Sequence, residues 1–229
     1  MIGSELQNGR KHKGWTQQLA SAKLGVSQPY LALMEKGDRP VSKKLARKAA
    51  QLYALSLTVL PIETDCSDAP RCDEPKVASY LAGLGYPGLA YMRPAIRRNP
   101  AEVLFVALSC ADLDSRLVEA LPWVLLQYHN LDWRWLLAAV KTQNLQNRLG
   151  FVTTMARQLA EQRGNQASAE SLKQNEAGLE RARLVHEDTL CHRSLSRAEK
   201  RWLRKNRPAE ARHWNLLTDL SPRHLSYAT

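Results

Sequence analysis

Residues 16–40 read TQQLASAKLGVSQPYLALMEKGDRP, and this stretch decides the fold of the N-terminal part of the chain. Thr16 is a good N-cap for a helix over 17–24, because its side chain can accept a hydrogen bond from a free backbone N–H group. Gly25 ends that helix, since glycine tolerates left-handed dihedral angles. A second helix is expected over 28–36. Two short helices joined by a three- or four-residue turn that contains glycine predict a helix-turn-helix.

Two further helices are expected around this pair, over 3–12 and 41–53. Leu31 and Met34 should anchor the second helix of the pair from below, while Val26 plugs the turn. The N-terminal residues that remain outward on that helix are the ones a recognition helix presents to base edges in the major groove. They are Gln28, Pro29, Tyr30 and Leu33.

Several residues of this stretch form a signature: TQQLA at 16–20, LGVSQ at 24–28, then Leu31, Glu35, Gly37 and Arg39-Pro40. With this signature, residues 1 to about 60 resemble the Cro/C1-type (Xre) family of repressors, which have a lambda-repressor-like helix-turn-helix domain. The resemblance covers near a quarter of the chain. It implies a helical domain that binds double-stranded DNA sequence-specifically through the major groove.

The resemblance also implies roles for single residues. Gln17 would bond a phosphate near the start of its helix, and Gln28 would read a base, since a Gln amide pairs with both N6 and N7 of adenine. Glu35 would be structural and hold the end of its helix near the turn. Three cations would contact backbone phosphates, with a purely solvated position as the alternative for each: Lys36, Arg39 and Lys43. The whole set expected to face DNA is Gln17, Ser27, Gln28, Pro29, Tyr30, Leu33, Lys36, Arg39 and Lys43.

Two neighbouring positions depart from the family pattern. Pro29 and Tyr30 stand where small or amide residues are common. Proline is well tolerated near a helix start, but it cannot hydrogen-bond a base. Tyr30 or Leu33 would instead meet thymine methyl groups or lie on the sugar-phosphate chain, so the identity of the bases stays open.

The distribution of charge favours a polyanionic partner for the N-terminal part. The chain of 229 residues has a formal net charge of +11, and residues 1–60 carry ten Lys and Arg against three Asp and Glu. Residues 61–75 carry one against five and are punctuated by proline, which indicates an acidic linker. No apolar run approaches the ~20 residues that span a bilayer, and no signal peptide is visible, so we expect a cytoplasmic protein without a membrane partner.

The rest of the chain also has helical patterns, so the expected fold class is all-α. Residues 76–163 are expected to form a larger helical domain for partner binding or dimerisation, and 164–229 a basic helical C-terminal arm. Asp132 is expected to cap a helix over 133–143. In the arm, basic residues flank Trp202 and could bind nucleic acid, but the interpretation we favour docks Trp202 on the helical domain.

The sequence contains no arrangement of residues suited to catalysis. It has no Gly-rich phosphate loop, nucleophile motif or metal-ligand spacing, so we expect no catalytic residues, no metal and no cofactor, and a protein that is not an enzyme. Four cysteines are too few and too scattered for a disulfide framework, and we expect ordinary thiols. Cys66 and Cys72 lie in the acidic linker without a second pair of ligands, which argues against zinc.

A dense aromatic block indicates how the helical domain would meet a partner. Trp, Tyr and Arg concentrate as anchors in protein interfaces, and four residues are candidates here: Trp123, Trp133, Trp135 and Arg148. An aromatic core is the alternative. The block is faintly similar to the domain downstream of the helix-turn-helix in regulators encoded beside toxins.

The sequence leaves three hypotheses for function. The first is a repressor that binds a palindromic operator as a homodimer, in particular an autoregulating antitoxin whose C-terminal region binds and neutralises a toxin. The second is a ligand-sensing regulator with a small-molecule pocket in the helical domain. The third, an enzyme fused to an operator-binding domain, is disfavoured by the absence of catalytic motifs.

Overall fold

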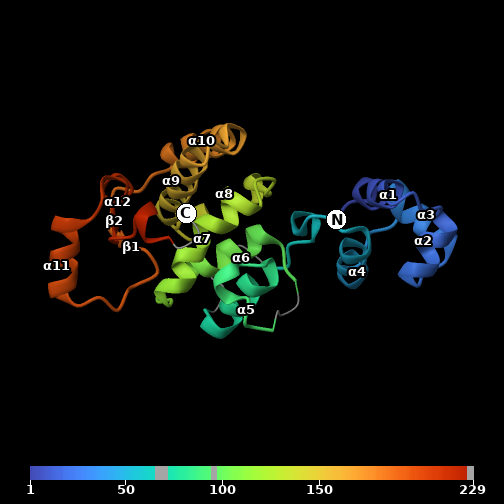
Figure 1. The fold of residues 1–229 in the computed structure, drawn as a ribbon, viewed down its shortest axis with the longest axis horizontal. Coiled ribbons are helices and arrows are strands. Elements are labelled where there is room, and N and C mark those ends of the chain that lie inside the picture. The colour runs from blue at the N-terminus through green and yellow to red at the C-terminus, as the bar shows by residue number, and fades with distance from the viewer. Residues whose placement is uncertain (65–71, 94–96, 226–229) are drawn as a thin grey trace. The chain divides into compact units, whose positions relative to one another are not determined.

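The computed structural model describes residues 1–64, 72–93 and 97–225. These residues form twelve α-helices and two short strands, so the expected all-α fold is confirmed. None of the helices among them has the length and apolar character needed to cross a membrane. The chain divides into two compact units (Figure 1): unit 1 comprises Met1–Glu63 with Arg97–Asn99, and unit 2 comprises Thr64–Ile96 with Pro100–Thr229.

Unit 1 is built from four α-helices and a short 3-10 helix: α1 (Gly3–His12), α2 (Gln17–Leu24), α3 (Gln28–Lys36), α4 (Lys43–Tyr53) and η1 (Leu57–Val59). The first three have the bounds expected from the sequence. The fourth begins two residues later than expected because Ser42 is its N-cap, whose hydroxyl accepts a hydrogen bond from the Leu45 N–H group at 3.3 Å. The core of the unit consists of Leu6, Ala20, Leu24, Leu31, Met34, Leu45, Ala49 and Tyr53.

Two glycines let α1 approach its neighbours closely. A Cβ atom on Gly3 would lie 2.2 Å from the carbonyl oxygen of Met34, and one on Gly9 would lie 2.8 Å from the ring of Tyr53. Both distances are far below a van der Waals contact. Only a residue without a side chain therefore fits at these positions, where α1 packs against α3 and α4.

The segment 61–75 is partly built into the two units, although the sequence predicted a linker there. Glu63 forms an ion pair with Arg47 in unit 1, and helix α5 of unit 2 already begins at Glu74. Residues 65–71 of the expected linker lie outside the described residues. Two acidic residues of this segment, Glu63 and Glu74, thus belong to the folded units.

Unit 2 is organised around one long helix, α9, which packs against α7, α8, α10 and α12 and is buried along most of its length. Two strands form a two-residue parallel pair that the sequence did not predict. The elements of the unit are α5 (Glu74–Leu84), η2 (Pro87–Leu89), α6 (Pro100–Ser109), α7 (Ser115–Gln127), α8 (Trp133–Thr142), α9 (Gln146–Gln162), α10 (Gln166–Glu180), β1 (Asp188–Thr189), α11 (Arg197–Asn206), α12 (Ala209–His213), β2 (Leu216–Leu217) and η3 (Pro222–His224).

Trp214 joins the expected C-terminal arm to the expected helical domain. Its ring is fully buried against α9, where a Cβ atom on Gly150 would lie 2.4 Å from a ring carbon. The Nε1 atom of Trp214 donates a hydrogen bond to Oγ1 of Thr154 at 2.8 Å. The residues on either side of the boundary expected between 163 and 164 therefore share one core.

Cys72 and Cys110 form a disulfide bond, with their Cα atoms 5.0 Å apart. The prediction of ordinary thiols is wrong for this pair, because the start of α5 and the end of α6 meet although 38 residues separate the two cysteines. Cys191 is a free thiol, and burial raises its pKa to about 11. Cys66 lies outside the described residues.

Candidate nucleic-acid interface

The turn between α2 and α3 is fixed by the residues at its two ends. Gly25 adopts a φ angle of +77°, the left-handed conformation that ends α2, and the N–H group of Val26 then bonds to the Ser21 carbonyl at 3.0 Å. The Ser27 hydroxyl accepts a hydrogen bond from the Tyr30 N–H group at 3.3 Å, which satisfies a free donor at the start of α3. The turn predicted from the sequence is confirmed.

Helix α3 presents one side to solvent. Leu31 and Met34 are fully buried in the core of unit 1, so the opposite side of the helix turns outward. Tyr30 and Leu33 are 40% and 39% exposed, although both are large and hydrophobic. The exposed N-terminal residues of α3 are the ones that the sequence predicts for base recognition: Gln28, Pro29, Tyr30 and Leu33. Their contacts with DNA stay a prediction.

A buried carboxylate ties α3 to α1 and α2. Arg10 donates to both oxygens of Glu35, from Nε at 2.6 Å and from Nη2 at 2.9 Å. Gln17 donates from Nε2 to the same carboxylate at 3.0 Å. Burial by itself raises the pKa of Glu35, but the hydrogen bonds from Arg10 and Gln17 and the charge of Arg10 outweigh it, so the pKa lies below its ordinary value. Glu35 therefore stays ionised and holds three helices together.

Gln17 has a structural role in addition to the one that the sequence predicts for it. The side chain is half-buried, and one hydrogen of its amide is used by Glu35. A glutamine amide carries two hydrogens, so the predicted phosphate contact would use the second one. That contact stays a prediction.

Cations flank the exposed side of α3. Three of them are exposed, and within the described part of the chain no hydrogen bond or ion pair engages their side chains: Lys36, Arg39 and Lys43. Lys48 and Lys23 are used within unit 1 instead. Nζ of Lys48 donates to the Leu24 carbonyl at 2.8 Å, and Nζ of Lys23 lies 5.0 Å from the ring centroid of Trp15. The three cations predicted to bind phosphates therefore remain available, as do Lys13 and Lys44, which are also exposed.

The part of the chain that forms this turn and its helices also matches a known family. Residues 6–60 match the helix-turn-helix family model. The chain carries an Xre-type helix-turn-helix domain. This match supports a DNA-binding transcription regulator. No curated protein and no solved structure matches the chain.

The helix-turn-helix domain depends on a residue that the sequence did not single out, Arg10. A buried carboxylate needs a paired cation or several hydrogen bonds, so the burial of Glu35 requires such a residue. The sequence offers several cations near the end of α1, including Lys11 and Lys13, and does not say which of them faces α3. Only the packing of α1 selects Arg10.

Arg148 is not available to a partner. Its guanidinium group is buried in unit 2, where Nε donates to the Asp188 carboxylate at 2.7 Å. Nη1 donates to the carbonyl oxygens of Leu108 and Cys110 at 2.8 and 2.9 Å. The prediction of Arg148 as an interface anchor is wrong, because its side chain connects α9 to the end of α6 and to β1.

The three tryptophans predicted for an interface are half-buried within unit 2. Trp123 makes an edge-to-face contact with Tyr86 at 5.4 Å between ring centroids, and Trp135 makes one with Phe105 at 5.6 Å. Nε1 of Trp133 is buried and has no hydrogen-bond partner among the described residues. These contacts favour the alternative of an aromatic core, and a role in an interface stays a prediction.

Proposed function

We propose that the protein is a transcriptional repressor that binds a palindromic operator as a homodimer. Helix α3 would enter the major groove with Gln28 at a base edge, while the free cations beside it bind phosphates. The observation that carries the proposal is the exposed N-terminal part of α3, held on a rigid scaffold by the Arg10–Glu35 pair. Two such helices about one helical turn apart, ~34 Å, would occupy adjacent major grooves and exclude polymerase.

Selection of binding sites from a library of random duplexes tests this proposal. With the full chain, we expect enrichment of a palindrome whose half-sites lie about one turn, or a multiple of it, apart. The complex should contain two chains per duplex in sedimentation or light scattering. A single, unrepeated site bound by one chain would contradict the homodimer, and the absence of any enriched sequence would contradict specific recognition.

We further propose that unit 2 is the partner-binding part of an autoregulating antitoxin, which neutralises a toxin. Support comes from a second unit with its own core and from three half-buried tryptophans that leave part of their surface uncovered: Trp123, Trp133 and Trp135. Co-expression with the product of the neighbouring gene tests this. We expect the two proteins to co-elute and growth arrest by the second protein to be relieved. If no complex forms, the antitoxin role is refuted.

A ligand-sensing regulator is the second candidate, because unit 2 has a cavity of about 540 Å³, a size found in small-molecule sites. The cavity lies beside α7, α11 and η3, and its lining includes Leu113, Val118 and Leu220, with His192 and His224. A metabolite that raises the melting temperature of the full chain, but not of a Val118→Trp variant that fills the cavity, would favour this function over the antitoxin.

A further inference from the structure

Helix α11 is a basic helix at the edge of unit 2, and Figure 1 shows it beyond β1 and β2. It begins at a capping box, in which the Ser196 hydroxyl accepts from the Glu199 N–H group at 3.3 Å and the Glu199 carboxylate accepts from the Ser196 N–H group at 2.7 Å. Its inner side packs through Leu203, which clusters with Leu195 and Leu217. The helix is therefore fixed to the unit by a narrow contact and presents most of its surface to solvent.

Trp202 lies on the part of α11 that no neighbour covers. It is 55% exposed, whereas the sequence predicted that it docks on the helical domain. That prediction is wrong because Leu203 takes the inward position, and consecutive residues of an α-helix project about 100° apart. An exposed tryptophan in a basic helix needs an explanation other than core packing.

Three cations line the outer face of α11 at intervals of four residues: Arg197, Arg201 and Lys205. Residues four apart lie on the same face of a helix, and the three span roughly 12 Å along its axis. Within the described part of the chain, no hydrogen bond or ion pair engages their side chains. Arg204 differs, since it pairs with Glu187 at 2.7 Å.

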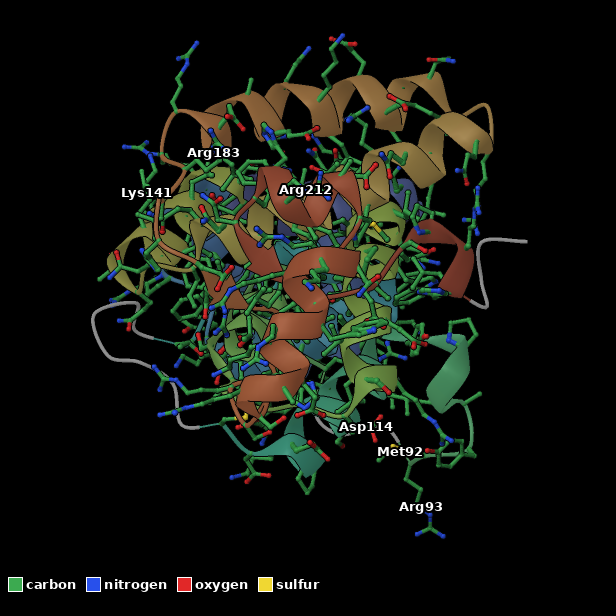
Figure 2. The ribbon with its side chains drawn as sticks, turned by 90° about the vertical axis from the view of Figure 1, so that its left-hand side faces the viewer. Met92, Arg93, Asp114, Lys141, Arg183 and Arg212 are labelled. Carbon is green, nitrogen blue, oxygen red and sulfur yellow. A yellow bond between two sulfur atoms is a disulfide. The ribbon has the colours of Figure 1, made fainter. Side chains whose placement is uncertain are left out.

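The acidic residues nearby do not neutralise this face. Residues 190–213 contain eight Lys and Arg and two Glu. Glu199 belongs to the capping box, and Glu210 accepts a hydrogen bond from Gln158 at 2.7 Å. A helix face that is only solvated usually mixes charges of both signs at spacings of three or four residues. Here one sign dominates, and Arg212, labelled in Figure 2, adds an exposed cation on the side of unit 2 that carries α11.

We propose that α11 is a second DNA-contacting surface, which binds backbone phosphates without regard to sequence. Arg197, Arg201 and Lys205 bind phosphates along one strand, and Trp202 packs against a deoxyribose beside them. The charge of this face is complementary to the DNA backbone. Its exposed aromatic ring offers an apolar surface for a deoxyribose, and contacts to sugars and phosphates position a protein on a duplex without reading its sequence.

An anionic membrane is the other polyanion to consider. A helix that binds a bilayer surface inserts an apolar face among the lipids. In α11 the apolar side is already covered, because Leu203 packs against Leu195 and Leu217 within unit 2. One tryptophan is left for insertion, so the observations favour DNA.

The surface on α11 is independent of recognition by α3. Gln28 is expected to provide discrimination between sequences, whereas α11 adds affinity that is common to all sequences. Either proposal can fail while the other holds. Recognition by α3 is measured by the ratio of specific to non-specific binding, whereas the contribution of α11 is measured by non-specific binding alone.

The triple variant Arg197→Gln, Arg201→Gln and Lys205→Gln of the full chain tests the charge of this surface. Its binding to a duplex without an operator is measured by fluorescence anisotropy at several salt concentrations. The slope of log affinity against log salt should become shallower by about 2 to 3, since each lost phosphate contact contributes ~0.9. At low salt the affinity should fall at least roughly tenfold. Unchanged binding would overturn the proposal.

A matched control removes the same charge from another part of unit 2. Arg134, Lys141 and Lys173 are exposed cations of α8 and α10, and their joint replacement by Gln should leave the salt slope near that of the unaltered protein. Equal losses in the two triple variants would overturn the proposal, because they would report net charge alone. So would weaker binding of the α11 variant to phosphatidylserine vesicles with its duplex binding intact.

Two further variants separate the parts of the surface. Trp202→Ala should weaken duplex binding about fivefold without changing the salt slope, since tryptophan carries no charge. Unchanged affinity would contradict a contact between Trp202 and DNA. Arg197→Lys with Arg201→Lys should keep the salt slope, and a loss would contradict phosphate binding by point charges. All these substitutions leave Leu203 and the capping box intact, so circular dichroism spectra and melting temperatures should match those of the unaltered protein.

Discussion

Arg10 and Glu35 form a bidentate ion pair across the contact between α1 and α3, with distances of 2.6 Å for Nε–Oε1 and 2.9 Å for Nη2–Oε2. Their side chains are 11% and 1% exposed. The pair thus removes two charges from water and positions the helix that is expected to read DNA. Because a bidentate contact restricts orientation as well as distance, it fixes α3 against α1 more strictly than apolar packing alone.

Removal of Arg10 should destabilise unit 1 strongly. The Arg10→Ala variant leaves the Glu35 carboxylate buried without its cation, which costs about 3–5 kcal/mol in comparable pairs. Lys11→Ala removes an exposed cation one residue away and should change the free energy of unfolding by less than about 0.5 kcal/mol. Urea unfolding of the full chain, followed by circular dichroism, measures both. If Arg10→Ala lowers the free energy of unfolding as little as Lys11→Ala does, then water screens the ion pair between Arg10 and Glu35.

The stability conferred by Glu35 should depend on pH in acid. Its pKa is lowered in the folded protein, so its contribution is complete above the ordinary value of 4.5 and is lost as the pH falls through the lowered value. The Glu35→Gln variant should therefore be less stable than the unaltered protein at neutral pH, and the difference should shrink in acid. Urea unfolding across this range measures it, and a difference independent of pH would contradict the assignment.

Two substitutions in the helix-turn-helix domain should separate base recognition from phosphate binding. Gln28→Ala should weaken binding to the operator by about 1–3 kcal/mol and binding to random DNA far less. Lys43→Ala should weaken both alike and make the salt slope shallower by about 1. Binding isotherms with the selected operator and with a scrambled duplex measure the effects. Equal losses for the two variants would show that α3 is not the recognition helix.

Local signals made the helix-turn-helix predictable. Thr16, Gly25 and Ser27 act on backbone groups within a few residues, so the bounds of α2 and α3 could be read without knowledge of the tertiary structure. Asp132 is a similar case, since its carboxylate caps α8 through the Trp135 N–H group at 3.0 Å. The outward side of α3 followed from helical periodicity.

Contacts between distant residues were not predictable in the same way. Arg148 bonds to Asp188, 40 residues away, and the sequence carries no sign that this arginine is buried, because most arginines are exposed. Cys72 and Cys110 meet only because α5 packs against α6. Trp202 could not be assigned to solvent or core until Leu203 was seen to face inward.

The disulfide between Cys72 and Cys110 should contribute substantially to the stability of unit 2. Closure of a loop with a sequence separation of 38 residues restricts the unfolded chain, which corresponds to about 4 kcal/mol in the chain-entropy estimate. A Cys72→Ala variant should melt at a lower temperature than the unaltered protein, and addition of dithiothreitol should lower only the melting temperature of the unaltered protein. If dithiothreitol has no effect on either, the bond does not stabilise the unit.

Gly150 should not accept a side chain while Trp214 is present. The Cβ atom of a Gly150→Ala variant would lie 2.4–2.5 Å from three carbons of the Trp214 ring, so the ring or α9 must move, at a cost of about 1–3 kcal/mol. Gly178→Ala is the matched control in α10: its Cβ atom would lie 3.8 Å from Cδ1 of Leu137, an ordinary contact, and the gain in helix propensity should stabilise the protein by about 0.5–1 kcal/mol. Thermal unfolding measures both.

A double variant shows whether the clash is the cause. Trp214→Leu alone should be strongly destabilising, because it leaves a cavity in the core that α9 shares with the C-terminal part. In the Gly150→Ala background the same change should cost less, since it also relieves the contact with the new methyl group. Strictly additive losses would mean that Gly150→Ala destabilises α9 for another reason, and that Trp214 does not select glycine at this position.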